Sequence, residues 1–295
     1  MTNVWIIRPG ALGDTLLTLP LLFSIKNADE KANVTLLGSR AYHEIIPPEF
    51  NFKSVDHRDY SWLFQPDSFG EHPKEKPCDI AYVILKRPDA VVANLKSCGV
   101  DDIHIATPIP EPGVHLVQTL CSQLGAAIPP RHPVLNGNQL GKRENILWAH
   151  PGSGSAKKNV PLSVFRSLSK RLRETTGCEI VVTLGEADEE LKREKEWELW
   201  IAESRPVVLE NRSLKQICDL MSHSGFFMGN DSGMSHLAAA LGIFSIIFYV
   251  STDPAQWGPW VPARQTLIFD CSRVFSWSLV QNQIERAVQT TLERQ

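Results

Sequence analysis

Three segments rich in glycine, serine and charge contain the residues whose types and spacing could do chemistry. They are residues 8–14 (RPGALGD), 150–158 (HPGSGSAKK) and 228–242 (MGNDSGMSHLAAALG). Each follows an apolar run and precedes a helical pattern, and strand-to-helix turns of this kind are where open α/β sheets bind ligands. We therefore treat these three segments as the candidate functional sites.

The first segment places Asp14 at the start of an expected helix. An aspartate in that position either caps the helix by accepting backbone N–H bonds or serves as a general base. The segment lacks the third glycine of the dinucleotide fingerprint, and no ribose-binding acid follows the second expected strand at residues 34–37. A nicotinamide-dependent enzyme is therefore disfavoured.

The second segment combines flexible backbone donors with Ser153, Ser155, Lys157 and Lys158. Such a loop can cradle a phosphate through its N–H groups while a lysine supplies a point charge. It lacks the consecutive Gly-Lys-Ser/Thr of a Walker A motif. The alternative is a solvated turn that carries two ordinary lysines.

The third segment is the most specific of the three. Asp231 or Ser232 would cap a helix whose first turn contains His236. The exposed amides and the dipole at such a helix start favour an anionic ligand. Because the apolar side chains of this helix lie on another face, we expect His236 to stand free at the edge of a cleft, although a single histidine on a helix is often structural.

The elements that must position these segments follow an α/β pattern in both halves of the chain. Short β-rich runs alternate with helical segments, as in parallel sheets covered by helices on both faces. Strands are expected at residues 4–8, 34–37, 52–55, 80–85, 103–106, 146–149, 179–184, 207–209, 226–228 and 243–249. Helices are expected at residues 15–27, 40–46, 89–97, 114–124, 161–173, 188–203, 214–222, 233–241 and 279–292.

The chain length of 295 residues predicts two domains, because a single core seldom grows this large. Apolar periodicity stops in residues 125–144, a stretch rich in proline and glycine that suits a linker. We expect domains at residues 1–135 and 136–295. The last helix either stays with the second domain or packs back on the first.

Composition excludes several classes of protein. A net charge of −3 does not favour binding to nucleic acid. The cysteines are scattered singly, without the spacing of a zinc site or a disulfide framework. The apolar N-terminus is interrupted by Arg8 and Asp14 and lacks a cleavage site, so it is read as core rather than as a signal peptide. We expect a cytoplasmic protein.

The candidate segments together resemble glycosyltransferase family 9, whose best-known members are the ADP-heptose:lipopolysaccharide heptosyltransferases. Four stretches carry the resemblance, residues 6–20, 150–161, 229–238 and 252–259. It implies a GT-B fold, in which two Rossmann-like domains with parallel sheets face an interdomain cleft. The N-terminal domain would bind the acceptor and the C-terminal domain the nucleotide-sugar.

The resemblance also implies an activity. It is the inverting, metal-independent transfer of a heptose or related sugar from a nucleoside diphosphate donor, ADP-heptose above all, to a lipopolysaccharide-core or similar glycan acceptor. No cofactor is implied beyond the nucleotide-sugar substrate. The expected partner is a glycolipid or oligosaccharide, reached by a monomer in peripheral contact with the inner face of the cytoplasmic membrane.

Site residues follow from the resemblance by position. Asp14 matches the catalytic base, and Lys158 matches the lysine that neutralises the diphosphate of the donor. Arg8 and Gly13 would contact the acceptor, and Arg8 together with Arg40, Arg58 and Arg87 could bind an acidic one. A carboxylate near the ribose is either Glu186 or Asp188. The donor-binding residues implied are Ser153, Lys158, Glu186, Asp188, Asp231, Ser232, Gly233 and His236.

Two other functions stay open at this point. A nucleotide-sugar epimerase would share the architecture, but it needs a second acid–base pair that the matching loops do not contain. A non-catalytic or degenerate nucleotide-sugar-binding protein is compatible with the short N-terminal half. Function resides in the site, so the fold alone does not separate these alternatives.

Overall fold

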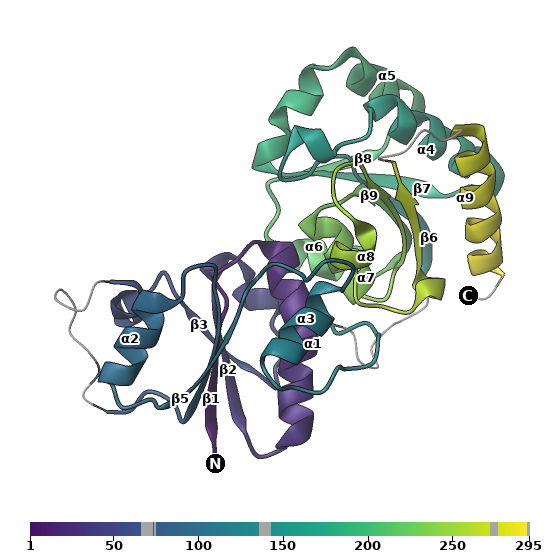
Figure 1. The fold of residues 1–295 in the computed structure, drawn as a ribbon. Coiled ribbons are helices and arrows are strands. Elements are labelled where there is room, and N and C mark those ends of the chain that lie inside the picture. The colour runs from purple at the N-terminus through teal and green to yellow at the C-terminus, as the bar shows by residue number, and fades with distance from the viewer. Residues whose placement is uncertain (66–72, 74, 136–142, 272–276, 294–295) are drawn as a thin grey trace. The chain divides into compact units, whose positions relative to one another are not determined.

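The computed structural model describes residues 1–65, 73, 75–135, 143–271 and 277–293, and the chain forms two compact units (Figure 1). Unit 1 comprises Met1–Pro130 with Ala255–Trp257. Unit 2 comprises Arg131–Pro254 with Gly258–Gln295. Residue 136, the expected start of the second domain, lies outside the described residues, so the boundary between residues 135 and 136 stays a prediction.

Unit 1 is built on a parallel sheet. Its strands are β1 (Asn3–Ile7), β2 (Asn33–Gly38), β3 (Asn51–Ser54), β4 (Ile80–Ile84) and β5 (Asp102–Ala106). They pair in the order β3-β2-β1-β4-β5. The order reverses between β1 and β4, so the loop after β1, which begins with Arg8, opens at the switch point where such sheets bind ligands.

Helices cover both faces of this sheet (Figure 1). Trp5 and Ile7 of β1 share a core with Val91 and Leu95. The helices are α1 (Leu12–Ala28), α2 (Asp89–Ser97) and α3 (Leu116–Gln123), with 3₁₀ helices η1 (Arg40–Ile45) and η2 (Arg58–Phe64). The short α8 (Pro254–Trp257) lies apart in the chain, and its last three residues are grouped with unit 1. Because alternate residues of a strand face opposite sides, the neighbouring residues of β1 point to the face covered by α1 and α3.

Unit 2 is built on a second parallel sheet. Its strands are β6 (Glu144–His150), β7 (Glu179–Leu184), β8 (Val207–Glu210), β9 (Ser224–Asn230), β10 (Phe244–Tyr249) and β11 (Thr266–Asp270). The order β11-β10-β9-β6-β7-β8 corresponds to the doubly wound Rossmann sheet. Its switch point lies between β6 and β9, so the loops after these two strands meet at one edge.

The helices of unit 2 are α4 (Leu162–Thr176), α5 (Lys195–Ser204), α6 (Leu214–Met221), α7 (Gly233–Ala240) and α9 (Trp277–Leu292), with 3₁₀ helices η3 (Ala156–Lys158), η4 (Glu186–Arg193) and η5 (Ala263–Gln265). Val280, Ile284 and Val288 of α9 join the core formed by β6 and α4. The sequence left open where this last helix packs, and the structure places its apolar face in unit 2 (Figure 1).

Several elements differ from the sequence prediction, and the helices η2, α8 and η5 were not expected at all. The helix expected at residues 40–46 is the 3₁₀ helix η1, in which only Ile45 is buried, so it has no apolar face to stabilise an α-helix. The helix expected at residues 188–203 divides into η4 and α5, because Glu194 between them is extended. The strand β11 was not predicted.

Candidate functional site

The loop after β6 carries Lys158 to the end of β9. Its Nζ lies 2.7 Å from Oδ2 of Asp231, and the side chains of Lys158 and Asp231 are 33% and 6% exposed. The hydroxyl of Thr252 donates to the same carboxylate oxygen. The ammonium group is therefore held by a buried countercharge while part of it stays open to solvent and to a ligand.

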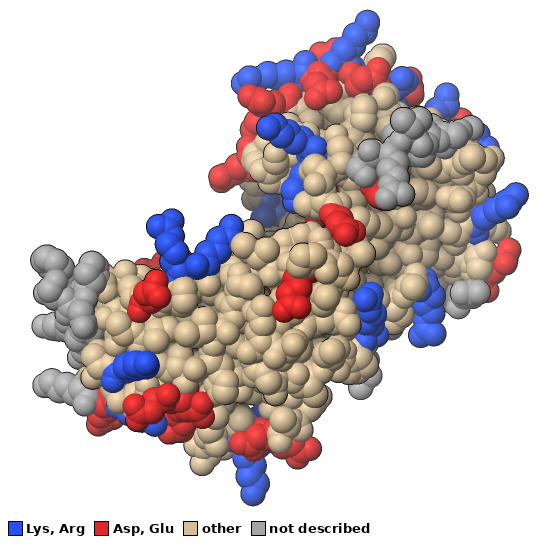
Figure 2. Space-filling model, in the orientation of Figure 1, with Lys and Arg blue, Asp and Glu red and all other residues tan. Residues whose placement is uncertain are grey.

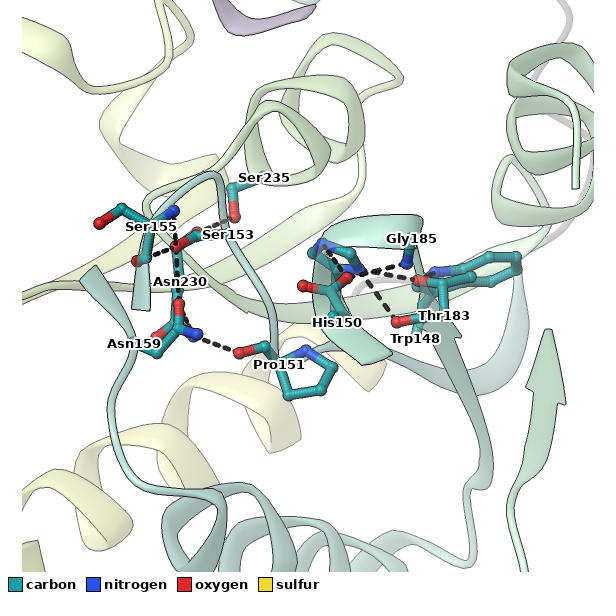
Figure 3. Close-up of polar contacts among 11 residues, drawn as sticks. Trp148, His150, Pro151, Ser153, Ser155, Asn159, Thr183, Gly185, Asn230 and Ser235 are labelled. Atoms are coloured by element: carbon teal, nitrogen blue, oxygen red, sulfur yellow. Dashed lines mark hydrogen bonds and ion pairs between the residues drawn. The ribbon is translucent and has the colours of Figure 1, made fainter. Parts of the chain in front are cut away.

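Hydrogen bonds within the loop hold its shape (Figure 3). The Ser153 hydroxyl lies 2.7 Å from the Ser155 carbonyl oxygen and 2.6 Å from Oδ1 of Asn159. Asn159 in turn contacts Asn230 at the end of β9. Ser153 was expected to bind the donor, but its side chain is buried and forms hydrogen bonds within its own loop.

The start of α7 faces the same edge of the sheet. Ser232 occupies the N-cap position with an extended backbone, and its side chain makes no capping hydrogen bond. Its Oγ is buried and is among the described side-chain atoms that lack a hydrogen-bond partner. Gly233 opens the helix and is half-buried. A helix N-terminus with an unused hydroxyl beside Lys158 can receive an anionic group.

His236 lies in the first turn of α7, as the sequence predicted, but its surroundings differ from the expectation. The residue is only 7% exposed, so it is packed into unit 2 rather than standing free at an edge. The apolar residues Leu237 and Ala238 that follow are also buried. The helix is embedded from Ser235 onward because α7 packs against both β9 and β10.

The two acids after β7 have different environments. Asp188 is 4% exposed, and its carboxylate accepts the Gly185 N–H at 2.8 Å. A Cβ placed on Gly152 would lie 1.7 Å from Oδ1 of Asp188, so the backbone of the loop after β6 passes directly against this carboxylate. Glu186 is exposed. Asp188 therefore fixes the turn, and Glu186 is open to a ligand.

His150, the last residue of β6, lies beside this turn (Figure 3). Its Nδ1 lies 3.0 Å from the Thr183 carbonyl oxygen, which can only accept, so Nδ1 carries the proton. Its Nε2 lies 3.8 Å from Asp188. Burial lowers the pKa of His150, although the carboxylate of Asp188 and the carbonyl of Thr183 act in the opposite direction.

In unit 1 the loop after β1 brings Arg8 and Asp14 together. Arg8 Nη2 donates to Asp14 Oδ1 at 2.7 Å, and the Ala11 N–H donates to Oδ2 at 3.0 Å. A Cβ on Gly10 would lie 2.7 Å from that of Asp14, so the turn needs a glycine. Burial lowers the pKa of Arg8, and Asp14 opposes the shift. Arg8, expected to contact the acceptor, is buried against Asp14, and Gly13 is half-buried in the first turn of α1.

Sequence reasoning gave no role to Asn230, Asn159 or Thr252, although all three lie in the four stretches that carry the family resemblance. Asn230 bonds to residues about 70 positions earlier in the chain, and Thr252 bonds across 21 positions. The available signal was an amide or hydroxyl residue placed beside the charged residues at the end of an apolar strand. Local patterns do not reveal the partner of such a residue.

The described residues contain neither a cluster of metal-binding side chains nor a helix suited to spanning a membrane. No three His, Cys, Asp or Glu side chains in the described ranges gather into a group that could hold a metal ion. Within the same ranges, none of the helices combines the length and apolar character needed to cross a bilayer. The expected cellular location stays a prediction.

Comparison with known proteins identifies relatives of the chain. The family model described as glycosyltransferase family 9 (heptosyltransferase) matches residues 110–275. A putative glycosyltransferase of Haemophilus influenzae is 29% identical over 128 residues, which are 41% of this chain. The match spans 36% of the length of that curated relative.

Solved structures of similar fold cover nearly the whole chain. A family 9 glycosyl transferase from Veillonella parvula has a TM-score of 0.74 at 14% identity, with 100% of this chain and 98% of that chain covered. The Escherichia coli ADP-heptose lipopolysaccharide heptosyltransferase II has a TM-score of 0.70 at 15% identity, with coverage of 98% and 99%. The E. coli heptosyltransferase WaaC with ADP has a TM-score of 0.67 at 16% identity, with coverage of 97% and 99%. The expected GT-B fold is confirmed.

Proposed function

Because this chain belongs to glycosyltransferase family 9, a family of sugar-transferring enzymes, we propose that it moves a heptose or related sugar from a nucleoside diphosphate to a glycan acceptor. The proposed reaction is inverting and independent of metal. The observation that carries the proposal is Lys158, which lies against the buried Asp231 beside the start of α7. That arrangement can bind the diphosphate of a donor.

The donor diphosphate would bind at this helix start. Its charge would be met by the Lys158 ammonium group, by the first-turn N–H groups of α7 and by the unused hydroxyl of Ser232. ADP-heptose is the proposed donor, and the support for it is that one relative was crystallised with ADP and with ADP-2-deoxy-2-fluoro heptose. Gly233, Asp231 and His236 complete the proposed donor-binding group.

For the ribose of the donor we propose Glu186 rather than Asp188. A ribose is held by a carboxylate that accepts its hydroxyl protons, as in other Rossmann-type sheets. Asp188 already accepts the Gly185 N–H and is buried beneath the Gly152 backbone. Glu186 is exposed two residues earlier, in the first turn of η4. Ser153 is proposed to support the loop rather than to contact the donor.

Asp14 is the proposed general base. The acceptor hydroxyl would attack the anomeric carbon and give its proton to the carboxylate of Asp14 as the bond to the diphosphate breaks. The diphosphate would leave with the electron pair of that bond, and Lys158 would neutralise the charge. The Arg8 guanidinium and the Ala11 N–H orient the carboxylate, one at each oxygen. Each carboxylate oxygen retains a second lone pair for the incoming proton.

The acceptor proposed is an anionic glycan, such as a lipopolysaccharide core that carries phosphate or a keto-sugar acid. Four exposed basic residues, Arg40, Arg58, Lys86 and Arg87, lie just after the carboxyl ends of β2, β3 and β4. Figure 2 shows Lys and Arg side chains along this edge of unit 1. Charges at the carboxyl edge of a parallel sheet are placed to meet a ligand that binds there.

The test is an Asp14→Asn variant assayed for transfer from ADP-heptose to deacylated lipopolysaccharide core. A positioned general base supplies about a 100-fold to 10,000-fold effect, so transfer should fall by that range. ADP affinity should stay at the parental value because Asp14 lies in unit 1 and the proposed diphosphate site lies in unit 2.

The matched control is Asp89→Asn, which changes an exposed aspartate in the first turn of α2, another helix of unit 1. It should transfer sugar at the parental rate. A folded Asp14→Asn protein that retains the parental rate would refute the role of Asp14. A parental protein that binds no nucleotide would refute the donor site and favour a degenerate relative.

A further inference from the structure

Asn230 holds both ends of the loop that carries Lys158. Its Oδ1 accepts the Val160 N–H at 3.0 Å, and its Nδ2 donates to the Pro151 carbonyl oxygen at 2.6 Å. The same Nδ2 lies 3.4 Å from Oδ1 of Asn159. The residue is fully buried as the last residue of β9 (Figure 3). One side chain therefore ties the start and the end of the loop to the strand.

The contacts lie next to Lys158 in the chain. Asn159 and Val160 directly follow the lysine, and Asp231, which pairs with its ammonium group, directly follows Asn230. Two consecutive residues at the end of β9 thus fix the lysine at two points. Asn230 sets the backbone from which the side chain departs, and Asp231 sets where the side chain ends.

The contacts also require an amide at this position. Pro151 and Asn159 present acceptors to Nδ2, whereas Val160 presents a donor to Oδ1, so only a side chain with both a donor and an acceptor satisfies all three. An aspartate of the same shape would put an acceptor against two acceptors. A buried polar group left without a partner carries a free-energy cost, so the loop would move.

We infer that Asn230 is a positioning residue for donor binding, which acts through Lys158 and does not itself touch the donor. This inference rests on the proposed function, because it assumes that Lys158 binds the diphosphate. If this is so, replacing Asn230 lowers the affinity for ADP only when Lys158 is present. A residue needed only for folding would weaken binding whether or not the lysine were present.

The experiment is a double-mutant cycle on ADP affinity, measured by calorimetry on the full chain. Lys158→Met keeps the stem of the side chain and removes the charge, and it should weaken ADP binding by about 10-fold or more. Asn230→Asp should weaken binding by a similar factor in the parental protein. In the Lys158→Met background it should change the affinity by less than about 2-fold.

A milder variant keeps the test valid if Asn230→Asp fails to fold. Asn159→Ala, at a half-buried position, removes the 3.4 Å contact with Asn230 and the hydrogen bond from the Ser153 hydroxyl, but it leaves the Asn230 bonds to Pro151 and Val160 in place. It should weaken ADP binding several-fold, again only when Lys158 is present. The matched control is Asn145→Asp, which changes an asparagine of β6 that bonds to the Thr176 carbonyl oxygen outside the loop. This control should bind ADP with the parental affinity.

The outcomes separate this inference from the proposed function. If ADP binds the parental protein and Lys158→Met weakens it, but the Asn230 or Asn159 effect is equal in both backgrounds, the inference is overturned while the donor site stands. If Lys158→Met binds ADP as tightly as the parental protein, the proposed function fails at its own premise, and this inference fails with it.

Discussion

The contact between Gly152 and Asp188 provides a sharp test of how the loop after β6 is packed. Gly152→Ala adds a single methyl group at a position where the structure leaves no room for one. That methyl carbon would lie 1.7 Å from Oδ1 and 2.2 Å from Cγ of Asp188. Either the loop must shift or the carboxylate must leave the Gly185 N–H.

The size of the effect follows from these two ways of relieving the clash. Added atoms in a well-packed interior cost about 1–3 kcal/mol, and a lost hydrogen bond to a charged group costs about 1.5–3 kcal/mol. We expect Gly152→Ala to lower the free energy of unfolding of unit 2 by about 1–3 kcal/mol, by whichever route costs less. At about 2–4 °C per kcal/mol for a unit of this size, the melting temperature should fall by about 2–12 °C.

Thermal melting followed by circular dichroism measures this shift, and the same loop supplies the control. A Cβ on Gly154 would meet nothing within 4 Å, so Gly154→Ala should melt near the parental temperature. Asp188→Ala removes the clashing carboxylate. The double variant Gly152→Ala/Asp188→Ala should therefore have the same melting temperature as Asp188→Ala alone. If Gly152→Ala and Gly154→Ala have the same melting temperature, the Gly152 backbone does not pass as close to the Asp188 carboxylate as the structure shows.

Two further predictions concern unit 2. The half-buried guanidinium of Arg143 donates to the Ser222 carbonyl oxygen at 2.6 Å and the Leu241 carbonyl oxygen at 2.8 Å. Arg143→Met should therefore lower the free energy of unfolding in urea by about 2–4 kcal/mol, and an unchanged urea midpoint would contradict this. Because burial lowers the pKa of His150 from 6.5, the unfolded chain binds a proton there that the folded chain does not, and stability should fall as the pH drops through 6.5. His150→Gln should flatten this decline in urea titrations at several pH values, and an equally steep decline would count against it.

Much of the fold follows from local patterns in the sequence. The helix at residues 89–97 and the strand at residues 179–184 were predicted with the bounds that the structure shows. Each has a strong local signal, an acidic first turn after Pro88 in the helix and a β-branched apolar run in the strand. Such elements need no knowledge of their tertiary partners.

Elements that depend on tertiary contacts were predicted less well. Residues 188–203 read as one helix because Glu, Lys and Leu all favour helices. In the structure the carboxylate of Asp188 bonds back to Gly185 and starts a 3₁₀ helix instead, and the buried Trp197 and Trp200 stabilise only the second part as an α-helix. The propensities were correct, but the contacts of Asp188 decided the outcome.

In the candidate site, too, local features were predicted and features that depend on tertiary contacts were not. The loops of Lys158 and Asp231 were recognisable from their residue types, because charge and glycine after an apolar strand are local features. The burial of Arg8 and His236 was not, since it depends on which strands and helices cover each loop. The hydrogen bond from Asn230 to the Pro151 carbonyl oxygen spans 79 positions, a separation at which sequence patterns carry no information about pairing.

The central place of β6 in its sheet has a consequence for synthesis of the protein. β6 pairs on one side with β7, which follows soon after it, and on the other side with β9, whose residues come about 80 positions later. The ribosome adds about 5–20 residues per second, so the edge of β6 that pairs with β9 stays unpaired for roughly 4–16 s during synthesis. An unpaired strand edge can pair with another chain, so this interval is when nascent unit 2 is most exposed to aggregation and most in need of a chaperone.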